Sequence, residues 1–175
     1  MSKEKAGRTT GADKTQSGGA AGAARGPQSK RELDAILRAI FEKKVPFNRL
    51  LGLKVVSTDP AAPRVRFDMR PDLIGNPTRQ TLHGGVISAV LDVAAGFAIH
   101  LALVEKQRAA AEEVRFPNIG TVDLRVDYLR PGRGKHFIAS CRVVRLGKRI
   151  AVTHMELVND EGELIATGGA AYVVG

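Results

Sequence analysis

Four residues in the middle of this chain have the types and the spacing of a site that could hold negative charge and move a proton. His83, Gly84 and Gly85 precede an almost wholly apolar stretch that runs to Val104, and Asp92 is the one carboxylate within it. Glycines let a ligand approach the backbone closely, and the N–H groups at a helix N-terminus stabilise negative charge. We therefore predict an oxyanion hole at the glycines, with Asp92 as a base or a nucleophile.

Each of these residues also has a purely structural interpretation. The tripeptide alone could be a tight turn from a loop into a helix, and Asp92 could make a hydrogen bond to the backbone or to Ser88. However, an acid in an apolar run is costly unless it is paired, solvated or used, and no Lys or Arg lies between His83 and Glu105. We interpret His83 as a positioning residue rather than a general base, because Asp92 is the more unusual group.

The spacing of Gly84 and Asp92 indicates how many chains build the site. They are eight residues apart, so on one helix they lie about 12 Å apart along its axis. A carbonyl bound at the Gly84 N–H needs its attacking atom within about 3.5 Å. A second copy, antiparallel across a two-fold axis, can bring its Asp92 beside the first copy's Gly84. If the site is catalytic, we expect two composite sites per homodimer.

The apolar stretch from Val86 to Val104 is 19 residues long, which is enough to cross a bilayer. A charge at Asp92, near its centre, would be costly there. The stretch also carries Ser88, His100 and many alanines of modest hydrophobicity. A single helix buried by its own protein explains this pattern better than a membrane span.

The flanking segments have the alternation of half-buried strands. Val65, Phe67 and Met69 alternate with charged residues, and strands are expected over 50–69, 122–128, 137–146, 150–158 and 164–174. Short turns between the later strands favour an antiparallel meander. We predict an α+β fold in which one long helix lies against one antiparallel sheet.

The N-terminal part divides into two segments. Residues 1–28 contain no Leu, Ile, Val or Phe, so we interpret them as a disordered basic tail of low complexity. They lack the apolar core of a signal peptide. Ser29 and Glu32 have capping-box spacing, and an apolar stripe follows before Pro46, which predicts a helix over 29–45. Residues 29–175 are expected to form one domain.

Composition limits the partners. The net charge is +9, but there is no run of five basic residues and aromatics make up only 5% of the chain, so we predict no nucleic-acid partner. The single cysteine, Cys141, fits a small buried side chain in the reducing cytoplasm. The other histidines show no metal-ligand spacing, and we predict no metal; they are His100, His136 and His154.

The segment Leu82–Val86, with Asp92 nine residues after His83, resembles the PaaI-like hotdog thioesterases. The segments Thr121–Asp123, Tyr128–Gly132 and Leu146–Arg149 are similar to that family's later strands and turns, and the resemblance covers about Leu50 to Val174. It implies a curved antiparallel sheet around one long helix, in dimers and often in dimers of dimers. It also implies hydrolysis of acyl-CoA thioesters without metal or cofactor.

Carried over by position, the Gly84 N–H would polarise the thioester carbonyl, and Asp92 of the partner chain would be nucleophile or general base. Thr121 matches a position where the family often orients water. The chain departs from the family pattern in two places. The family often has an asparagine six residues before the motif histidine. That position is Pro77 in this chain, and the asparagine, Asn76, stands one residue earlier. Thr121 falls on the polar side of its strand and reaches the helix only if the strand bends or begins there.

CoA carries phosphates, so basic residues on two predicted turns become candidate substrate-binding groups together with the Gly85 backbone. They are Arg130, Arg133, Lys148 and Arg149. Ordinary solvated turns would look the same. An alternative function is a non-catalytic hotdog sensor that binds acyl-CoA and uses its basic tail on DNA or a partner. A hotdog dehydratase would pair a His with an acid in a different local motif, which this sequence lacks.

Overall fold

One long helix forms the centre of the protein. The computed structural model describes residues 29–116 and 118–175, so the tail predicted for residues 1–28 lies outside its described part. Helix α3 (Gly84–Ala109) begins at the glycine pair and continues five residues beyond the apolar stretch. Within the described ranges it is the one helix long and apolar enough to cross a membrane, and more than half of its most apolar window is buried inside the protein. The prediction of a single core helix is confirmed.

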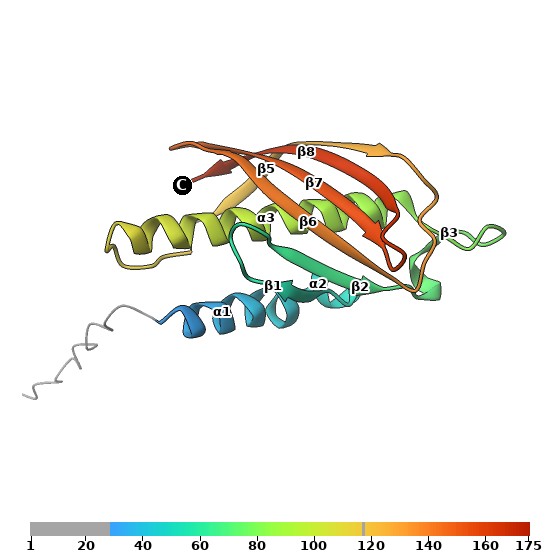
Figure 1. Ribbon diagram of the computed structural model, residues 1–175, viewed down its shortest axis with the longest axis horizontal. Helices are drawn as coiled ribbons and strands as arrows, with labels where there is room; N and C mark the ends of the chain where they lie inside the picture. Colours follow the sequence, from blue (N-terminus) through green and yellow to red (C-terminus); the bar gives the residue numbers. More distant parts are fainter. Residues whose placement is uncertain (1–28, 117) are drawn as a thin grey trace, which may run out of the picture.

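A six-stranded antiparallel sheet wraps around α3 (Figure 1). Its strands are β1 (Lys54–Ser57), β2 (Arg64–Asp68), β5 (Ile119–Tyr128), β6 (His136–Leu146), β7 (Ile150–Asn159) and β8 (Leu164–Val174). Two short strands, β3 (Ile74–Asn76) and β4 (Thr81–Leu82), pair separately in a hairpin just before α3. The predicted α+β hotdog architecture is therefore confirmed.

The predicted meander is right for three strands and wrong for the fourth. Strands β6, β7 and β8 are neighbours in sequence and in space, but the full spatial order is β1-β2-β6-β7-β8-β5. Strand β2 takes the place beside β6, and every residue of β2 pairs with β6. Strand β5 therefore pairs with β8 instead, and β1 and β5 become the two edges of the sheet.

Helices from the N-terminal segment cover the β1 side of the molecule. The helix expected over 29–45 is present as α1 (Lys30–Ala39) and a π-helical turn, η1 (Ile40–Lys44), and Ser29 and Glu32 form the predicted capping box. The expectation of strand from Leu50 onward is wrong at its start. Pro46 occupies the first turn of a further helix, α2 (Pro46–Leu51), a position where proline's fixed φ is favourable.

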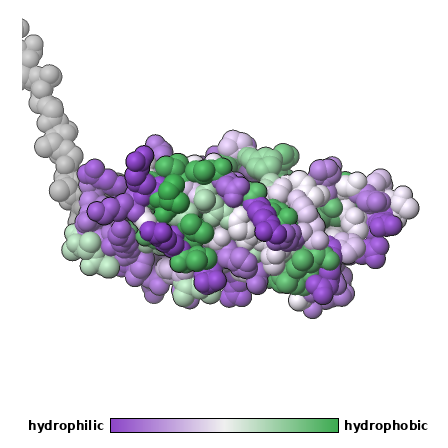
Figure 2. Space-filling model, turned by 90° about the horizontal axis from the view of Figure 1, so that it is seen from above, coloured by the Kyte–Doolittle hydropathy of each residue, from purple (hydrophilic) through white to green (hydrophobic). Residues whose placement is uncertain are grey.

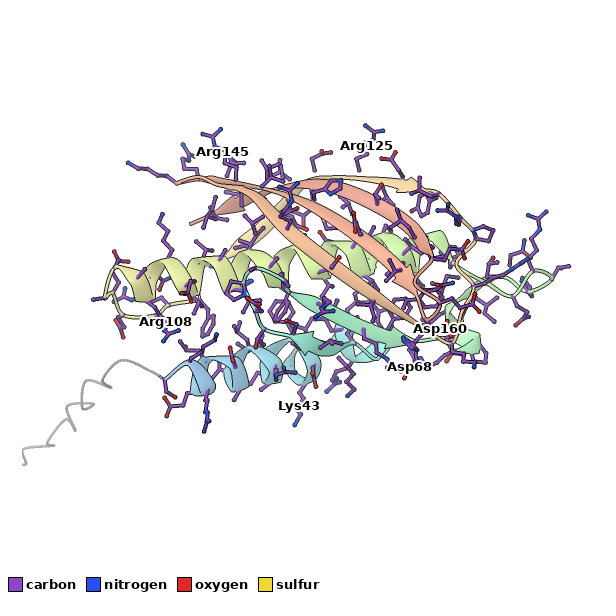
Figure 3. All side chains as sticks on the ribbon, viewed as in Figure 1. Lys43, Asp68, Arg108, Arg125, Arg145 and Asp160 are labelled. Carbon is purple, nitrogen blue, oxygen red and sulfur yellow. The ribbon has the colours of Figure 1, made fainter. Side chains whose placement is uncertain are left out.

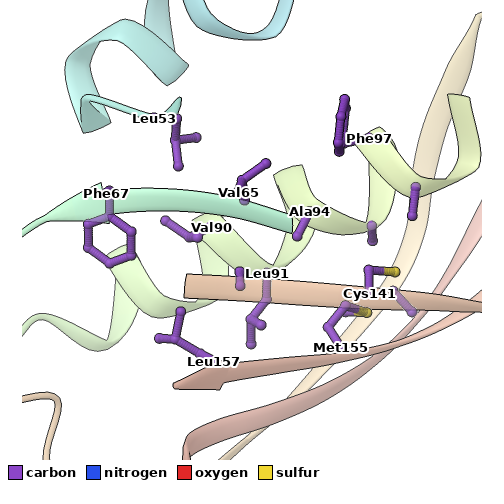
Figure 4. Close-up of a cluster of buried hydrophobic side chains, with 14 of the residues drawn as sticks. Leu53, Val65, Phe67, Val90, Leu91, Ala94, Phe97, Cys141, Met155 and Leu157 are labelled. Atoms are coloured by element: carbon purple, nitrogen blue, oxygen red, sulfur yellow. The ribbon is translucent and has the colours of Figure 1, made fainter. Parts of the chain in front are cut away.

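The core lies between α3 and the concave face of the sheet (Figure 4). Leu91 and Phe97 of the helix are fully buried, as are Phe67 of β2 and Met155 of β7. The alternation of buried and exposed residues along β7 is the pattern that predicted it. Cys141 is buried in this core, and burial raises the pKa of its thiol to about 12, as expected for a packing residue rather than a nucleophile.

Candidate active site

The first turn of α3 has one backbone N–H without a partner among the residues that the structure describes. His83 is the N-cap, and its Nδ1 accepts a hydrogen bond from the Gly85 N–H at 2.9 Å. The carbonyl of His83 accepts from the Val86 N–H at 3.0 Å and the Ile87 N–H at 3.3 Å. Of the four N–H groups that a helix start exposes, only that of Gly84 has no acceptor among the described residues. This is the group predicted to bind an oxyanion.

Side chains hold the peptide that follows this N–H. The hydroxyl of Tyr128, on β5, donates to the Gly84 carbonyl at 3.1 Å. The peptide between Gly84 and Gly85 is thus bonded at its carbonyl by Tyr128 and at its N–H by His83. In the structure the His83 Nδ1 is the N-cap acceptor and holds the first turn of α3, and its role in the site remains a prediction. Tyr128 was not among the predicted site residues, because the sequence placed it only at the end of the strand expected over 122–128.

Two glycines keep His83 in place by their lack of a side chain. A Cβ on Gly75, in β3, would lie 2.5 Å from the His83 Cα, and one on Gly85 would lie 2.9 Å from Nδ1. Either substitution would displace the histidine. By contrast, a Cβ on Gly84 would meet only the Tyr128 ring at ordinary contact distance, 3.5 Å. Packing within one chain therefore does not require glycine at position 84.

The carboxylate of Asp92 is anchored from the sheet. Its Oδ1 accepts hydrogen bonds from the Thr121 hydroxyl at 2.9 Å and from the Tyr172 hydroxyl at 2.6 Å. Ser88, the structural partner considered from sequence, donates instead to the Gly85 carbonyl at 3.1 Å. Within the described part of the chain no group donates to Oδ2. One oxygen of Asp92 is therefore held and the other is left for chemistry.

A β-bulge explains how Thr121 reaches Asp92. The register between β5 and β8 shifts at Val122, so that Thr121 pairs with Tyr172 and Asp123 pairs with Ala171. The extra residue turns Thr121 toward the helix and leaves the Val122 side chain 64% exposed. The bend that the sequence required for Thr121 is present. Beyond the bulge the polar residues of β5 face outward, as Arg125 does in Figure 3.

Tyr172 is the second partner of Asp92 and was not predicted. It is almost fully buried in β8, directly across from Thr121. Burial, followed by the hydrogen bond and the negative charge of Asp92, raises the pKa of its hydroxyl far above the ordinary value. It therefore remains a protonated donor at any physiological pH. Asp92 itself is half-buried rather than enclosed, because α3 passes beneath the open edge of the sheet at β5.

The structure places Asn76 at the end of β3, in the hairpin that projects beyond the N-terminal end of α3 (Figure 1). Its Oδ1 accepts a hydrogen bond from the Arg79 N–H at 3.0 Å, which holds the hairpin turn. No contact between Asn76 and Asp92 of the same chain is present among the described residues. A direct role for Asn76 in the site remains a prediction.

The basic residues predicted to contact CoA form two groups at opposite ends of the sheet. Arg130 lies 3.3 Å from the Glu163 carboxylate, and the Arg133 guanidinium donates to the Arg79 carbonyl. Lys148 and Arg149 are exposed in the turn after β6, at the far end of that strand. One chain therefore does not bring all four together. Across residues 29–116 and 118–175 there is no group of three or more His, Cys, Asp or Glu suited to a metal ion.

Comparison with known proteins shows the family to which the chain is similar. Residues 79–166 match the family model of the thioesterase superfamily. A Salmonella typhimurium protein named medium/long-chain acyl-CoA thioesterase YigI is 41% identical over 139 residues, which cover 78% of this chain and 90% of that protein. A crystal structure from Shewanella oneidensis, described as related to the thioesterase superfamily, is 38% identical with a TM-score of 0.72 and covers 83% of this chain and 97% of its own. The Escherichia coli PaaI structure, at 21% identity and a TM-score of 0.64, shares the fold over 78% of this chain and 88% of its own.

Proposed function

This chain belongs to the thioesterase superfamily, and on that basis we propose that it hydrolyses acyl-CoA thioesters to a free acid and CoA in two composite sites of a homodimer. The observation that supports this most directly is the separation of two complementary groups within one chain. The Gly84 N–H has no acceptor in the described part of the chain, and an anchored carboxylate lies eight residues along the same helix at Asp92. The relatives named as medium/long-chain acyl-CoA thioesterases support the substrate class.

The edges of the sheet support pairing through β5. At the β1 edge the chain covers its own backbone: the Arg38 guanidinium donates to the Val55 carbonyl, and the Val55 N–H donates to the Glu42 carboxylate at 2.8 Å. Strand β5 is ten residues long and pairs on one side only, with β8. A long edge strand with unpaired backbone groups is a template for a second strand. We propose that this second strand is β5 of another copy.

This pairing would join the two halves of the site. Tyr128, near the end of β5, contacts Gly84, whereas Thr121, near its start, contacts Asp92. Two β5 strands that pair antiparallel about Leu124 and Arg125 set Thr121 of one copy beside Tyr128 of the other. The partner's Asp92 then lies beside Gly84. A stripe of α3 is exposed or half-exposed in one chain and would pack on the partner's helix; it consists of Gly85, Ser88, Ala89, Asp92 and Val93.

The same arrangement would place both basic groups at one site. Gly132, between Arg130 and Arg133, accepts the Leu82 N–H at 3.0 Å and so lies near Gly84. The Arg149 carbonyl accepts the Val174 N–H at 2.9 Å, two residues after Tyr172, and so lies toward the Asp92 end. In the proposed dimer, Arg130 and Arg133 of one copy flank the same site as the partner's Lys148 and Arg149. Their exposed cations suit the phosphates of CoA.

In the proposed reaction the Gly84 N–H binds the thioester oxygen and stabilises the charge that develops on it. As a base, the partner's Asp92 takes a proton from water while the water oxygen adds to the carbonyl carbon. As a nucleophile, Oδ2 adds to that carbon itself and forms an anhydride that water then cleaves. In either route the C–S bond breaks and its electron pair leaves on the CoA sulfur. Thr121 and Tyr172 hold Oδ1 and so aim Oδ2.

We also propose that dimers associate in pairs and that the protein works in the cytoplasm, where Cys141 stays reduced. Exposed apolar side chains gather on the outer face of the sheet, and they would be covered by a second dimer; they are Val144, Ile150, Val152 and Val173. Figure 2 shows apolar and charged groups interspersed on this face. A patch of this kind is a common protein–protein contact.

The decisive test is complementation between two inactive variants. Asp92→Asn removes the carboxylate charge, and we expect activity to fall by about 10²- to 10⁴-fold. Gly84→Pro removes only the unpartnered N–H, because proline is well accepted in the first helical position. The extended backbone of His83, with φ −66° and ψ 135°, also suits a residue before proline. We expect a loss of about 10²- to 10³-fold. The matched control, Gly84→Ala, keeps the N–H and should stay within about tenfold of wild type.

Co-expression of the two inactive chains with different tags gives a purified heterodimer. One of its two sites combines an intact Gly84 with an intact Asp92, so we expect about half of the wild-type rate of CoA release. A heterodimer as inactive as its parents would refute the composite site. Full activity of Asp92→Asn would refute the role of that carboxylate. Saturable acyl-CoA binding by the wild type without any CoA release would instead favour the sensor.

A further inference from the structure

An apolar cavity of about 380 Å³ lies between α2 and the start of α3. Its apolar lining comes from α2, from the turn η2 (Pro71–Leu73) with β3, and from the first turn of α3. These residues are Phe47, Leu50, Leu51, Leu73, Ile74 and Val86.

The cavity reaches the oxyanion position. His83 and Gly85, the residues on either side of Gly84, both line it, while Arg70 and Asp72 supply its polar margin. A thioester whose oxygen is bound at the Gly84 N–H therefore has an apolar space next to its carbonyl carbon. Such a space, close to a small number of directed polar groups, is typical of a ligand pocket.

We propose that this cavity holds the acyl chain of the thioester, and that α2 sets the length of chain the enzyme prefers. This inference rests on the proposed function. It adds where the acyl chain binds and which residues select its length. Because the cavity is continuous with the oxyanion position at Gly84, its most suitable occupant is the acyl chain of the thioester bound there. At about 30 Å³ for each water-sized group, the cavity has room for about a dozen such groups. A medium to long acyl chain has that size.

The mouth of the cavity is apolar although it faces water. Phe47 and Leu50 are 51% and 65% exposed, so the apo protein leaves two large side chains solvated. A bound chain would cover both of them. The Arg70 guanidinium donates to the Leu50 carbonyl at the end of α2, which ties this short helix to the strand side of the cavity. Arg70 is therefore a positioning residue for the wall that α2 forms.

The proposal predicts how turnover depends on chain length. Burying each additional methylene should raise kcat/KM by about two- to fourfold until the cavity is full. Val86→Trp places an indole in the cavity next to the site. We expect kcat/KM for dodecanoyl-CoA to fall by about tenfold or more, whereas that for butyryl-CoA stays within about twofold. Val56→Trp, at an exposed position of β1 that does not line the cavity, is the matched control and should leave both values unchanged.

A second variant tests the cavity without adding a bulky side chain, so it does not depend on whether the fold accommodates the tryptophan of Val86→Trp. Phe47→Ala removes an exposed side chain from the mouth and should lower kcat/KM for dodecanoyl-CoA by about fivefold, with little effect on butyryl-CoA. Thermal unfolding monitored by circular dichroism checks that each variant is folded. If wild type releases no CoA from any acyl-CoA, the proposed function fails. If wild type is active but both variants change all chain lengths equally, the acyl-chain site is overturned while the function stands.

Discussion

The two ends of the α3–β5 pair carry the two halves of the proposed site, and they are built differently. At the Gly84 end the chemical group is a backbone N–H, and side chains from His83 and Tyr128 hold the peptide after it. At the Asp92 end the chemical group is a side chain, and two hydroxyls from neighbouring strands hold one of its oxygens. Strand β5 contributes a hydroxyl to each end, so it helps to fix the distance between the two halves of the site.

This difference indicates which substitutions each end tolerates. The Gly84 end needs a helix start with an open N–H, so its chemistry should survive any residue at position 84 that keeps both the backbone path and that N–H, which proline does not. The Asp92 end needs one particular carboxylate in one orientation, so its chemistry depends on the residues around it. We therefore expect that substituting a residue that holds the reacting group lowers activity more at the Asp92 end than at the Gly84 end.

Among the residues that only support the two reacting groups, the hydroxyls that hold Asp92 should give the largest effect. Thr121→Val and Tyr172→Phe each remove one donor to Oδ1 with little change in shape. We expect kcat to fall by about tenfold in each, with KM within about twofold, because a hydrogen bond to a charged group is worth about 1.5–3 kcal/mol. Steady-state kinetics with one acyl-CoA measures both quantities.

The double variant sharpens this expectation. If both hydroxyls act only by aiming the same carboxylate, their combined loss should be smaller than the product of the two single losses. Combining either substitution with Asp92→Asn should cost nothing further, because the group that they position is gone. A tenfold loss from Thr121→Val that persists in the Asp92→Asn background would contradict positioning as its role.

The sequence predicts the chemical groups better than it predicts their surroundings. Gly84 and Asp92 stand out because a glycine pair before an apolar helix and a lone acid within it are unusual at the level of residue type. The strands over 137–174 follow from alternation and turn residues, and the structure has them at nearly the same bounds. These signals are local, so one sequence is sufficient for them.

The partners of Asp92 depend on non-local contacts. Tyr172 reaches Asp92 only because β5 pairs with β8 at the sheet edge, and nothing in the residues themselves excludes pairing with β6. The bulge at Val122 is likewise invisible to simple alternation, which places Thr121 on the wrong face. The basic residues show the same limit, since Arg130 and Lys148 look alike as turn cations but lie at opposite ends of the sheet.

A smaller effect concerns stability at alkaline pH, because two titratable groups, the Tyr172 hydroxyl beside Asp92 and the Cys141 thiol, are buried. The pKa of the Tyr172 hydroxyl is raised by burial and by Asp92, and that of the Cys141 thiol is raised to about 12 by burial. In the unfolded chain both groups lose their protons near their ordinary values, about 10 and 9. The unfolded state then binds fewer protons than the folded state, so the free energy of unfolding falls as pH rises.

Each group should contribute a slope of up to about 1.4 kcal/mol per pH unit above its unfolded pKa. Urea unfolding between pH 8.5 and 11 measures this slope. Cys141→Ala should flatten the curve from about pH 9 and Tyr172→Phe from about pH 10. An unchanged slope in Tyr172→Phe would show that its hydroxyl is not held as a buried neutral donor.

The smallest effect should come from the Gly84 end. Tyr128→Phe removes the hydroxyl that donates to the Gly84 carbonyl, but His83 and the helix itself still hold the peptide. Tyr128 is 55% exposed and its hydrogen bond joins two neutral groups, so loss of that bond should cost about 0.5–1 kcal/mol and lower kcat by about two- to fivefold. In Gly84→Pro, which has no N–H left to orient, the same substitution should have no further effect. If Tyr128→Phe reduced kcat as much as Tyr172→Phe does, the two ends would be equally dependent on their hydroxyls, and the asymmetry between a backbone donor and a side-chain acid would not hold.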